Sequence, residues 1–63
     1  MNTDLRAAEF RNFAASHIEL QTAIRRDDWR TAKLALEEIE VIEMHTSWGQ
    51  LRNRCAAVLA AHH

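Results

Sequence analysis

Apolar side chains in the first part of the chain, with one histidine among them, recur at intervals of three and four residues. This spacing is the period of one face of an α-helix, and its regular 3-4 alternation resembles a coiled-coil seam. It predicts a helix over about residues 4–26. Thr3 can cap its first amides, and Asp4 is favourable at the positive end of the helix dipole. The stripe consists of Phe10, Phe13, His17, Leu20 and Ile24.

A second helix is predicted from residue 29 onward, after a turn at about residues 27–28. The stretch "RRDDW" places two cations at the end of the first helix, and either Asp27 or Asp28 can cap the next one. So short a connection makes the two helices antiparallel. Trp29 is expected to close the hairpin as a core residue, whereas Leu34 and Val41 point to the opposite side. The face toward the first helix is predicted to consist of Trp29, Ala32, Leu36 and Ile39, with Ala35 and Ile42 beside them.

The stretch "EMHTSWGQLRNRC" decides whether the second helix continues or stops. Ser47 followed by Gln50 matches a capping box, and Gly49 lowers the local helix propensity, so both features favour a break within residues 45–49. Against a break, no proline enforces a stop, and the apolar spacing keeps its 3-4 phase through the whole stretch. The pattern favours one continuous helix over about residues 29–61.

A continuous second helix extends about three turns beyond the end of the first helix. Its apolar stripe is then uncovered in a monomer, and a stripe of that size needs a partner. We therefore expect an antiparallel helical hairpin that dimerises into a four-helix assembly, with a three-helix bundle as the alternative. The predicted dimer or partner interface consists of Val41, Met44, Trp48, Leu51, Cys55 and Val58.

The composition supports an all-α fold, because the chain has no proline, one glycine and no alternating β-type segment. Its 63 residues form one domain with a small core, which makes self-association a plausible source of stability. A single cysteine excludes an internal disulfide and fits a reducing compartment. The N-terminus lacks the pattern of a secretory signal, and no apolar run is long enough to span a bilayer, so a cytoplasmic protein is expected.

No pattern of catalytic, cofactor-binding or metal-binding residues stands out, and we expect neither an enzyme nor a cofactor. The histidines and Cys55 lack the spacings that bring two metal ligands to one helical face. Cys55 fits the apolar stripe as a packed thiol. His17 lies within the first stripe, where it is either a pH-sensitive core element or a neutral histidine bonded across an interface.

Charge is nearly balanced, at −1 overall, but it is unevenly distributed. The stretch "EEIEVIE" is acidic, whereas "RNR" near the end of the chain is basic. This distribution favours electrostatic complementarity to a partner or to an antiparallel second copy, with a solvated helix face as the alternative. Neither a membrane nor a nucleic acid is expected to attract the chain through its overall charge.

The length, the "RRDDW" hairpin and the apolar second helix resemble small phage-encoded helical inhibitors of host regulators, of the quorum-sensing anti-activator type. The resemblance implies a non-catalytic adaptor or inhibitor that sequesters a larger protein, such as a bacterial transcriptional regulator. The chain is also similar to the Rop-like plasmid copy-number proteins, which bind paired RNA loops as helical-hairpin dimers. That alternative implies RNA or DNA binding through clustered cations, for which the candidates are Arg6, Arg11, Arg52 and Arg54.

Overall fold

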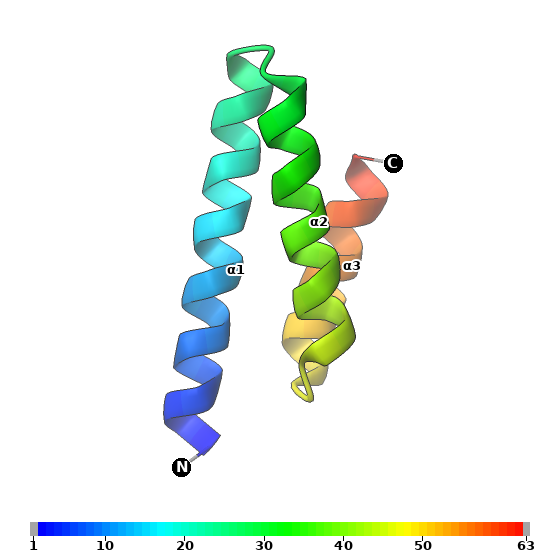
Figure 1. The fold of residues 1–63 in the computed structure, drawn as a ribbon. Helices are drawn as coiled ribbons and strands as arrows, with labels where there is room; N and C mark the ends of the chain where they lie inside the picture. Colours follow the sequence, from blue (N-terminus) through cyan, green and yellow to red (C-terminus); the bar gives the residue numbers. More distant parts are fainter. Residues whose placement is uncertain (1, 63) are drawn as a thin grey trace.

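The computed structural model describes residues 2–62, and the side chains of residues 4–62, as three helices (Figure 1). Helix α1 spans Asn2–Arg25, α2 spans Trp29–His45 and α3 spans Gly49–Ala61. Residues 2–62 contain no strand, so the predicted all-α class is confirmed. The capping role predicted for the Thr3 side chain lies outside the described side chains.

The turn between α1 and α2 has the hydrogen bonds of a Schellman motif, with an aspartate at the left-handed position. The amide of Asp28 donates to the Ala23 carbonyl at 2.8 Å, and the amide of Asp27 donates to the Ile24 carbonyl at 3.1 Å. Asp27 has a φ of 55°, in the left-handed region that aspartate tolerates better than most residues. Asp28 is the N-cap of α2, because its side chain accepts hydrogen bonds from the backbone N–H and the hydroxyl of Thr31. The predicted short antiparallel connection is present.

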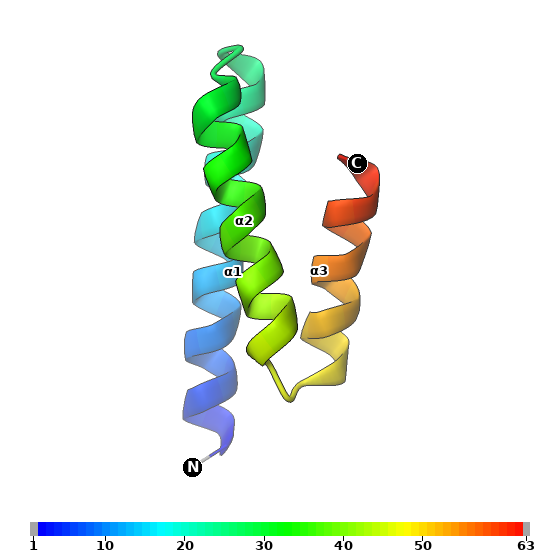
Figure 2. The same cartoon turned by 45° about the vertical axis from the view of Figure 1, so that its right-hand side comes forward.

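The predicted continuous helix over residues 29–61 is wrong, because the chain bends between α2 and α3 (Figure 2). Thr46 is the C-cap of α2, and its backbone N–H donates a hydrogen bond to the Ile42 carbonyl. Its own backbone is extended, with a ψ of 139°. Its hydroxyl oxygen accepts a hydrogen bond from the Trp48 amide at 3.1 Å, and its carbonyl accepts one from Arg52 Nη2 at 2.7 Å. Trp48, rather than Ser47, is the N-cap of α3, and no side chain caps that helix. The bend is therefore held by Thr46 and Arg52 instead of by the predicted capping box.

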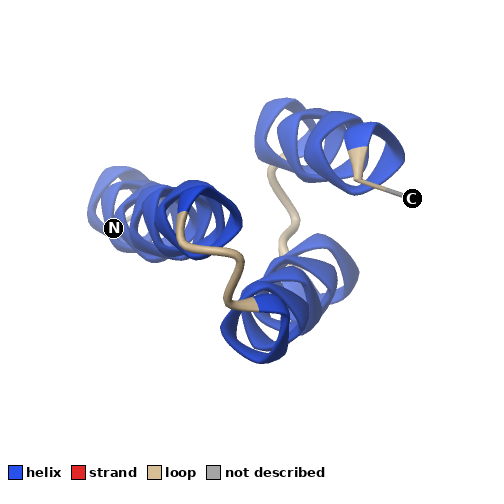
Figure 3. Cartoon of the chain, turned by 90° about the horizontal axis from the view of Figure 1, so that it is seen from above, coloured by secondary structure: helices blue, strands red, loops and turns tan. Residues whose placement is uncertain are grey.

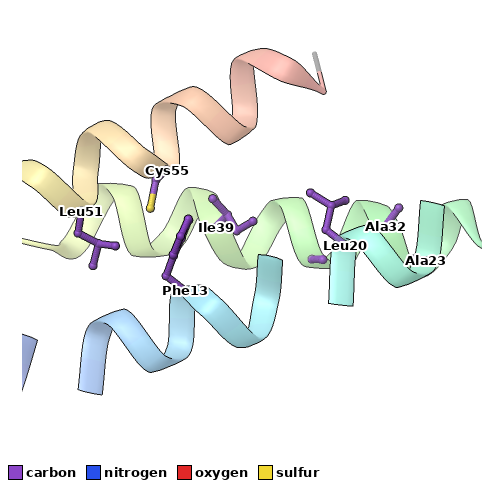
Figure 4. Close-up of a cluster of buried hydrophobic side chains, with 8 residues drawn as sticks. Phe13, Leu20, Ala23, Ala32, Ile39, Leu51 and Cys55 are labelled. Atoms are coloured by element: carbon purple, nitrogen blue, oxygen red, sulfur yellow. The ribbon is translucent and has the colours of Figure 1, made fainter. Parts of the chain in front are cut away.

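The buried apolar core receives side chains from all three helices (Figure 4). Alanines at several core positions allow α1 and α2 to pack closely, and the larger side chains fill the space between the helices. The core consists of Phe13, Leu20 and Ala23 from α1, Ala32, Ala35 and Ile39 from α2, and Leu51 and Cys55 from α3. Burying a large apolar side chain contributes about 1.5–3 kcal/mol, so the burial of Leu51 favours the folded-back position of α3 over a straight helix.

Trp29 is not the core residue that the sequence predicted. Its side chain is 63 % exposed, because Trp29 is the first residue of α2 and lies beyond the last buried layer, formed by Ala23 and Ala32. Leu36 is only partly buried and packs against the core from its edge. The centre of the hairpin is instead filled by Leu20 and Ile39, both fully buried.

Helix α3 packs mainly on α2 and makes little contact with α1 (Figures 2 and 3). Two pairs of cationic and aromatic side chains connect it to α1. The Arg6 guanidinium carbon lies 5.3 Å from the centre of the Trp48 ring, and that of Arg54 lies 5.7 Å from the centre of the Phe10 ring. The three helices form an elongated bundle with extents of 39 × 19 × 13 Å.

Candidate partner-docking face

Three large apolar side chains line up on the side of α2 that faces solvent. Leu34 and Val41 are seven residues apart, which is about two helical turns, and Met44 follows one turn later. Their exposed fractions are 51 % for Leu34, 54 % for Val41 and 76 % for Met44. We call these three residues the docking face. Exposed apolar side chains that gather on one side of a small protein are a candidate surface for binding another protein.

A groove between α1 and α2 adjoins the docking face. It is a shallow hollow of about 380 Å³, open to solvent and with mostly apolar walls, and one edge is formed by Val41 of the docking face itself. The Ser16 hydroxyl, which is buried, donates a hydrogen bond to Glu38 Oε2 at 2.8 Å and so joins α1 to α2 at the groove. The lining residues are Asn12, Ala15, Ser16, Glu38, Val41 and Ile42. Small side chains on α1 thus leave space beside the apolar row of α2.

The docking face has an acidic border. Glu37 lies between Leu34 and Val41 on α2, and Glu38 lies at the neighbouring groove; both are exposed. Glu40 and Glu43 instead line a groove with Leu59 and His62, on the side of α2 that faces α3. Glu37 and Glu38 are thus the acidic residues beside the docking face, and they make a partner with flanking cations favourable.

The bend divides the six residues that the sequence placed on one uncovered stripe. Val41 and Met44 are exposed as predicted, whereas Leu51 and Cys55 are fully buried in the core of the same chain. Trp48 and Val58 are partly buried and pack against that core. In this conformation only the α2 part of the stripe is available to a partner.

Cys55 packs as a buried thiol, as the sequence predicted. Burial raises its thiol pKa above the ordinary value, and the negative charge of Glu43 raises it further. A protonated thiol is a poor nucleophile and a poor metal ligand. Across residues 2–62, no three His, Cys, Asp or Glu side chains gather closely enough to hold a metal ion.

His17 is half-buried on α1, next to an aromatic side chain of the core. Its ring centre lies 5.6 Å from that of Phe13, and the two rings are tilted by 35°. Phe10 in turn lies 6.2 Å from Phe13. The histidine is therefore part of an aromatic row along α1 and lies outside the groove beside the docking face.

The arginines proposed as a nucleic-acid surface are largely engaged within the chain. Arg6 and Arg54 lie over the rings of Trp48 and Phe10, respectively. Arg52 donates to the Thr46 carbonyl at the bend. Arg11 is exposed on α1. Three of the four guanidinium groups thus stabilise the position of α3.

Sequence reasoning placed Val41 and Met44 at an interface, did not include Leu34 there, and missed the groove beside them. The seven-residue spacing of Leu34 and Val41 was visible, and both were expected to point away from α1. The contribution of Asn12, Ala15 and Ser16 depends on how α1 is rotated against α2, which the sequence pattern left open. The small side chain of Ala15 was the available signal.

Comparison with protein-family models, curated proteins and solved structures finds no match for this chain. Among residues 2–62, no helix combines the length and the apolar character that a membrane crossing requires.

Proposed function

We propose that the protein is a non-catalytic binding module that docks on a helix of a larger protein through Leu34, Val41 and Met44. The observation that carries the proposal is the row of exposed apolar side chains beside an apolar groove on one side of the bundle. A helix that binds in such a groove makes contact through anchor residues spaced three and four positions apart. The spacing of the docking face fits that mode of binding.

The charge around the docking face indicates the chemistry of the partner. Glu37 and Glu38 lie beside the apolar row, so the complementary partner is an amphipathic helix with Leu, Ile, Met or Phe anchors and flanking Lys or Arg. If two copies of the three-helix bundle met through the docking face, Glu37 and Glu38 of one copy would lie near Glu37 and Glu38 of the other. The acidic border thus favours a different protein over a second closed copy.

The partner class we propose is a bacterial transcriptional regulator, in line with the resemblance to phage-encoded inhibitors. A small bundle that covers one helix of a regulator can block its assembly or its DNA contact without any chemical step. The alternative of RNA or DNA binding would use Arg6, Arg52 and Arg54, which are exposed but each make a contact within the chain. Nucleic-acid recognition relies on cations available to phosphates.

The test compares the wild-type protein with Val41→Glu/Met44→Glu and with a matched control, Ile18→Glu. Ile18 is a similarly exposed apolar residue on α1, outside the groove. Each protein is used to capture partners from a bacterial lysate, and the captured protein is then purified and titrated by calorimetry. We expect the docking-face variant to bind about thirtyfold more weakly or worse, because one hot-spot residue is worth ~2 kcal/mol or more. The Ile18 control should bind as the wild type does.

Circular dichroism of all three proteins controls for folding, because the substituted positions are exposed and their loss should leave helicity unchanged. Gel-shift assays then ask whether the bound regulator still binds its DNA. Equal binding by the docking-face variant, loss of binding only in the Ile18 control, or a salt-dependent shift of RNA by the protein alone would contradict the proposal.

A further inference from the structure

The apolar stripe that crosses the bend has a symmetric spacing. Its intervals are three, four, three, four and three residues, so the order is the same when it is read from either end. Two straight copies placed antiparallel, with the centre between Gly49 and Gln50, therefore match every apolar residue with another. The matched pairs, one residue from each copy, are Val41 with Val58, Met44 with Cys55, and Trp48 with Leu51.

The bend that interrupts this stripe is short and is held by few interactions. Three residues separate α2 from α3, and none of them is proline. The hydroxyl and the carbonyl of Thr46 accept the hydrogen bonds from Trp48 and Arg52 that hold the bend. A straight helix would satisfy the same backbone groups with ordinary intrahelical bonds. Opening the bend therefore leaves none of these backbone groups without a partner.

The extended dimer keeps the charge complementarity of α2 and α3 that the closed bundle has within one chain. Helix α2 carries four glutamates against one arginine and one lysine, which leaves a charge of −2. Helix α3 has two arginines and no acidic residue, which gives +2. An antiparallel pair of straight helices places each acidic α2 along a basic α3, so the two contacts are complementary.

We propose that the chain has a second, extended conformation, in which residues 29–61 form one helix that pairs antiparallel with that of a second copy. The closed bundle leaves Val41 and Met44 exposed, whereas the extended dimer covers both. Opening separates Phe13 and Ile39 from Leu51 and Cys55, with which they share one buried core in the closed form. The closed monomer is therefore the form at low concentration, and the dimer forms as concentration rises.

The extended dimer goes beyond the proposed function and regulates partner binding. Because the dimer covers two of the three residues of the docking face, self-association and partner binding exclude each other. The inference itself does not depend on any partner, since it concerns the mass of the isolated protein. Failure of one proposal can therefore be told from failure of the other.

Gly49→Pro is the variant that locks the bend. Gly49 is the first residue of α3, where proline is well accepted, and the preceding Trp48 has the extended backbone that proline requires, with φ −90° and ψ 105°. A Cβ at residue 49 meets nothing within 4 Å. In a straight helix the same proline would remove a hydrogen bond and clash with the preceding turn. This variant keeps the closed bundle and forbids the extended one.

Thr46→Ala/Ser47→Ala is the straightening variant. It removes the hydroxyl that accepts the Trp48 amide, and it replaces two weak helix formers with the strongest one. Both residues lie outside the helices in the closed form and inside the helix in the extended form. The change therefore favours the extended form without touching the apolar stripe.

Sedimentation equilibrium over a hundredfold range of concentration measures the mass of each protein. We expect the wild type to rise from the monomer mass of 7.3 kDa toward twice that value, and the straightening variant to do so at about tenfold lower concentration. Gly49→Pro should stay monomeric with unchanged helicity. A wild type and straightening variant that both remain monomeric, or a Gly49→Pro protein that dimerises like the wild type, would overturn the proposal.

A cysteine pair tests the register of the dimer. In the extended form Met44→Cys faces Cys55 of the second copy, so mild oxidation should give a covalent dimer joined between these positions. The covalent dimer should be lost when Cys55→Ala is added, and when Gly49→Pro is added. A cross-link that survives Cys55→Ala joins the two copies at residue 44 and would refute the antiparallel register.

Discussion

At the scale of single residues, two aliphatic side chains occupy the place that sequence reasoning gave to a tryptophan. Leu20 and Ile39 are fully buried between the helices, whereas Trp29 lies at the rim of a groove of about 210 Å³ at the closed end of the hairpin. Volume and hydrophobicity alone favoured Trp29 as the anchor. Its position at the first residue of α2 places it outside the core.

We predict that Leu20→Ala and Ile39→Ala largely unfold the protein, whereas Trp29→Ala does not. Each truncation of a buried aliphatic side chain costs about 2–5 kcal/mol, which is comparable to the whole stability of a small domain. An exposed side chain contributes far less, about 0.5 kcal/mol. Urea unfolding followed by circular dichroism measures the three free energies. If Trp29→Ala lowered the free energy of unfolding as much as Ile39→Ala does, Trp29 would be a core residue after all.

A second prediction at this scale concerns the reactivity of Cys55. Its side chain is fully buried, and both burial and the charge of Glu43 raise the thiol pKa, so the thiol stays protonated at neutral pH. A disulfide exchange reagent should label it much more slowly than a free cysteine, and urea should remove the protection. Labelling at the rate of free cysteine in the native protein would contradict the buried position. The straightening variant should label faster wherever its α3 opens before the whole chain unfolds.

At the scale of the elements, the two aspartates of "RRDDW" have separate tasks. The sequence left open which of them caps α2, because both are suitable. The structure assigns the cap to Asp28 and the left-handed position of the turn to Asp27. The two roles differ by the φ angle of Asp27, which is set by the way α1 ends and not by residue type.

Asp27→Gly should stabilise the turn. Glycine adopts a positive φ without the steric penalty of a Cβ, and its substitution also removes a negative charge from the C-terminal end of the α1 dipole. We expect a gain of up to about 1 kcal/mol in the free energy of unfolding. The same substitution at Asp28 removes the side-chain cap and serves as the contrasting variant. A loss of stability in Asp27→Gly, measured by thermal unfolding, would contradict the left-handed turn.

The cap at Asp28 makes the stability of α2 dependent on pH. Hydrogen bonds from the Thr31 hydroxyl and then from the Thr31 amide lower the Asp28 pKa below its ordinary value. A folded pKa that is depressed gives stability that is present above the unfolded pKa, about 3.9, and lost as pH falls through the folded value. Asp28→Ala should therefore lower the thermal midpoint at pH 7, with the difference narrowing below about pH 4.

Asp28→Asn provides the matched control for this pH dependence. Asparagine caps helices well but has no titratable group. The thermal midpoint of Asp28→Asn should therefore lack the fall at acid pH that protonation of Asp28 causes in the wild type. A wild type and an Asn variant with identical pH profiles between pH 2 and 5 would show that this carboxylate does not contribute.

At the scale of the whole molecule, the position of α3 depends on a few contacts with α1. The rings of Trp48 and Phe10 lie under the guanidinium groups of Arg6 and Arg54, and these pairs join α3 to α1 where the helices otherwise make little contact. They add to the burial of Leu51 and Cys55, which holds α3 in place mainly through α2.

We predict that Arg6→Gln and Arg54→Gln each lower the free energy of unfolding by about 0.5–1 kcal/mol, the usual size of such a pair at a surface. Arg11→Gln is the control, since Arg11 is an exposed arginine of α1, as Arg6 is. Native-state hydrogen exchange should show faster exchange in α3 for the first two variants, with little change in the centre of α1. Uniform acceleration across all three helices would indicate that α3 does not open separately.

The sequence alone determined the elements that depend on local physics. Helix period, the absence of proline and the two short-range capping signals predicted an all-α chain, the extent of α1, the start of α2 and their antiparallel pairing. The same period identified Phe13, Leu20 and Ile39 as inward residues and Leu34 and Val41 as outward ones. These features are properties of neighbouring residues and require no knowledge of what packs on them.

Only the tertiary structure decided what happens at "HTSWG". Local signals were nearly balanced there: the apolar phase favoured a continuous helix, and Ser47 and Gly49 favoured a break. The bend forms because folding α3 back buries Leu51 and Cys55 against α1 and α2, a gain that exists only when all three helices meet. That long-range burial outweighs a few intrahelical hydrogen bonds, and it moves Leu51 and Cys55 from the exposed stripe into the core while Val41 and Met44 stay exposed.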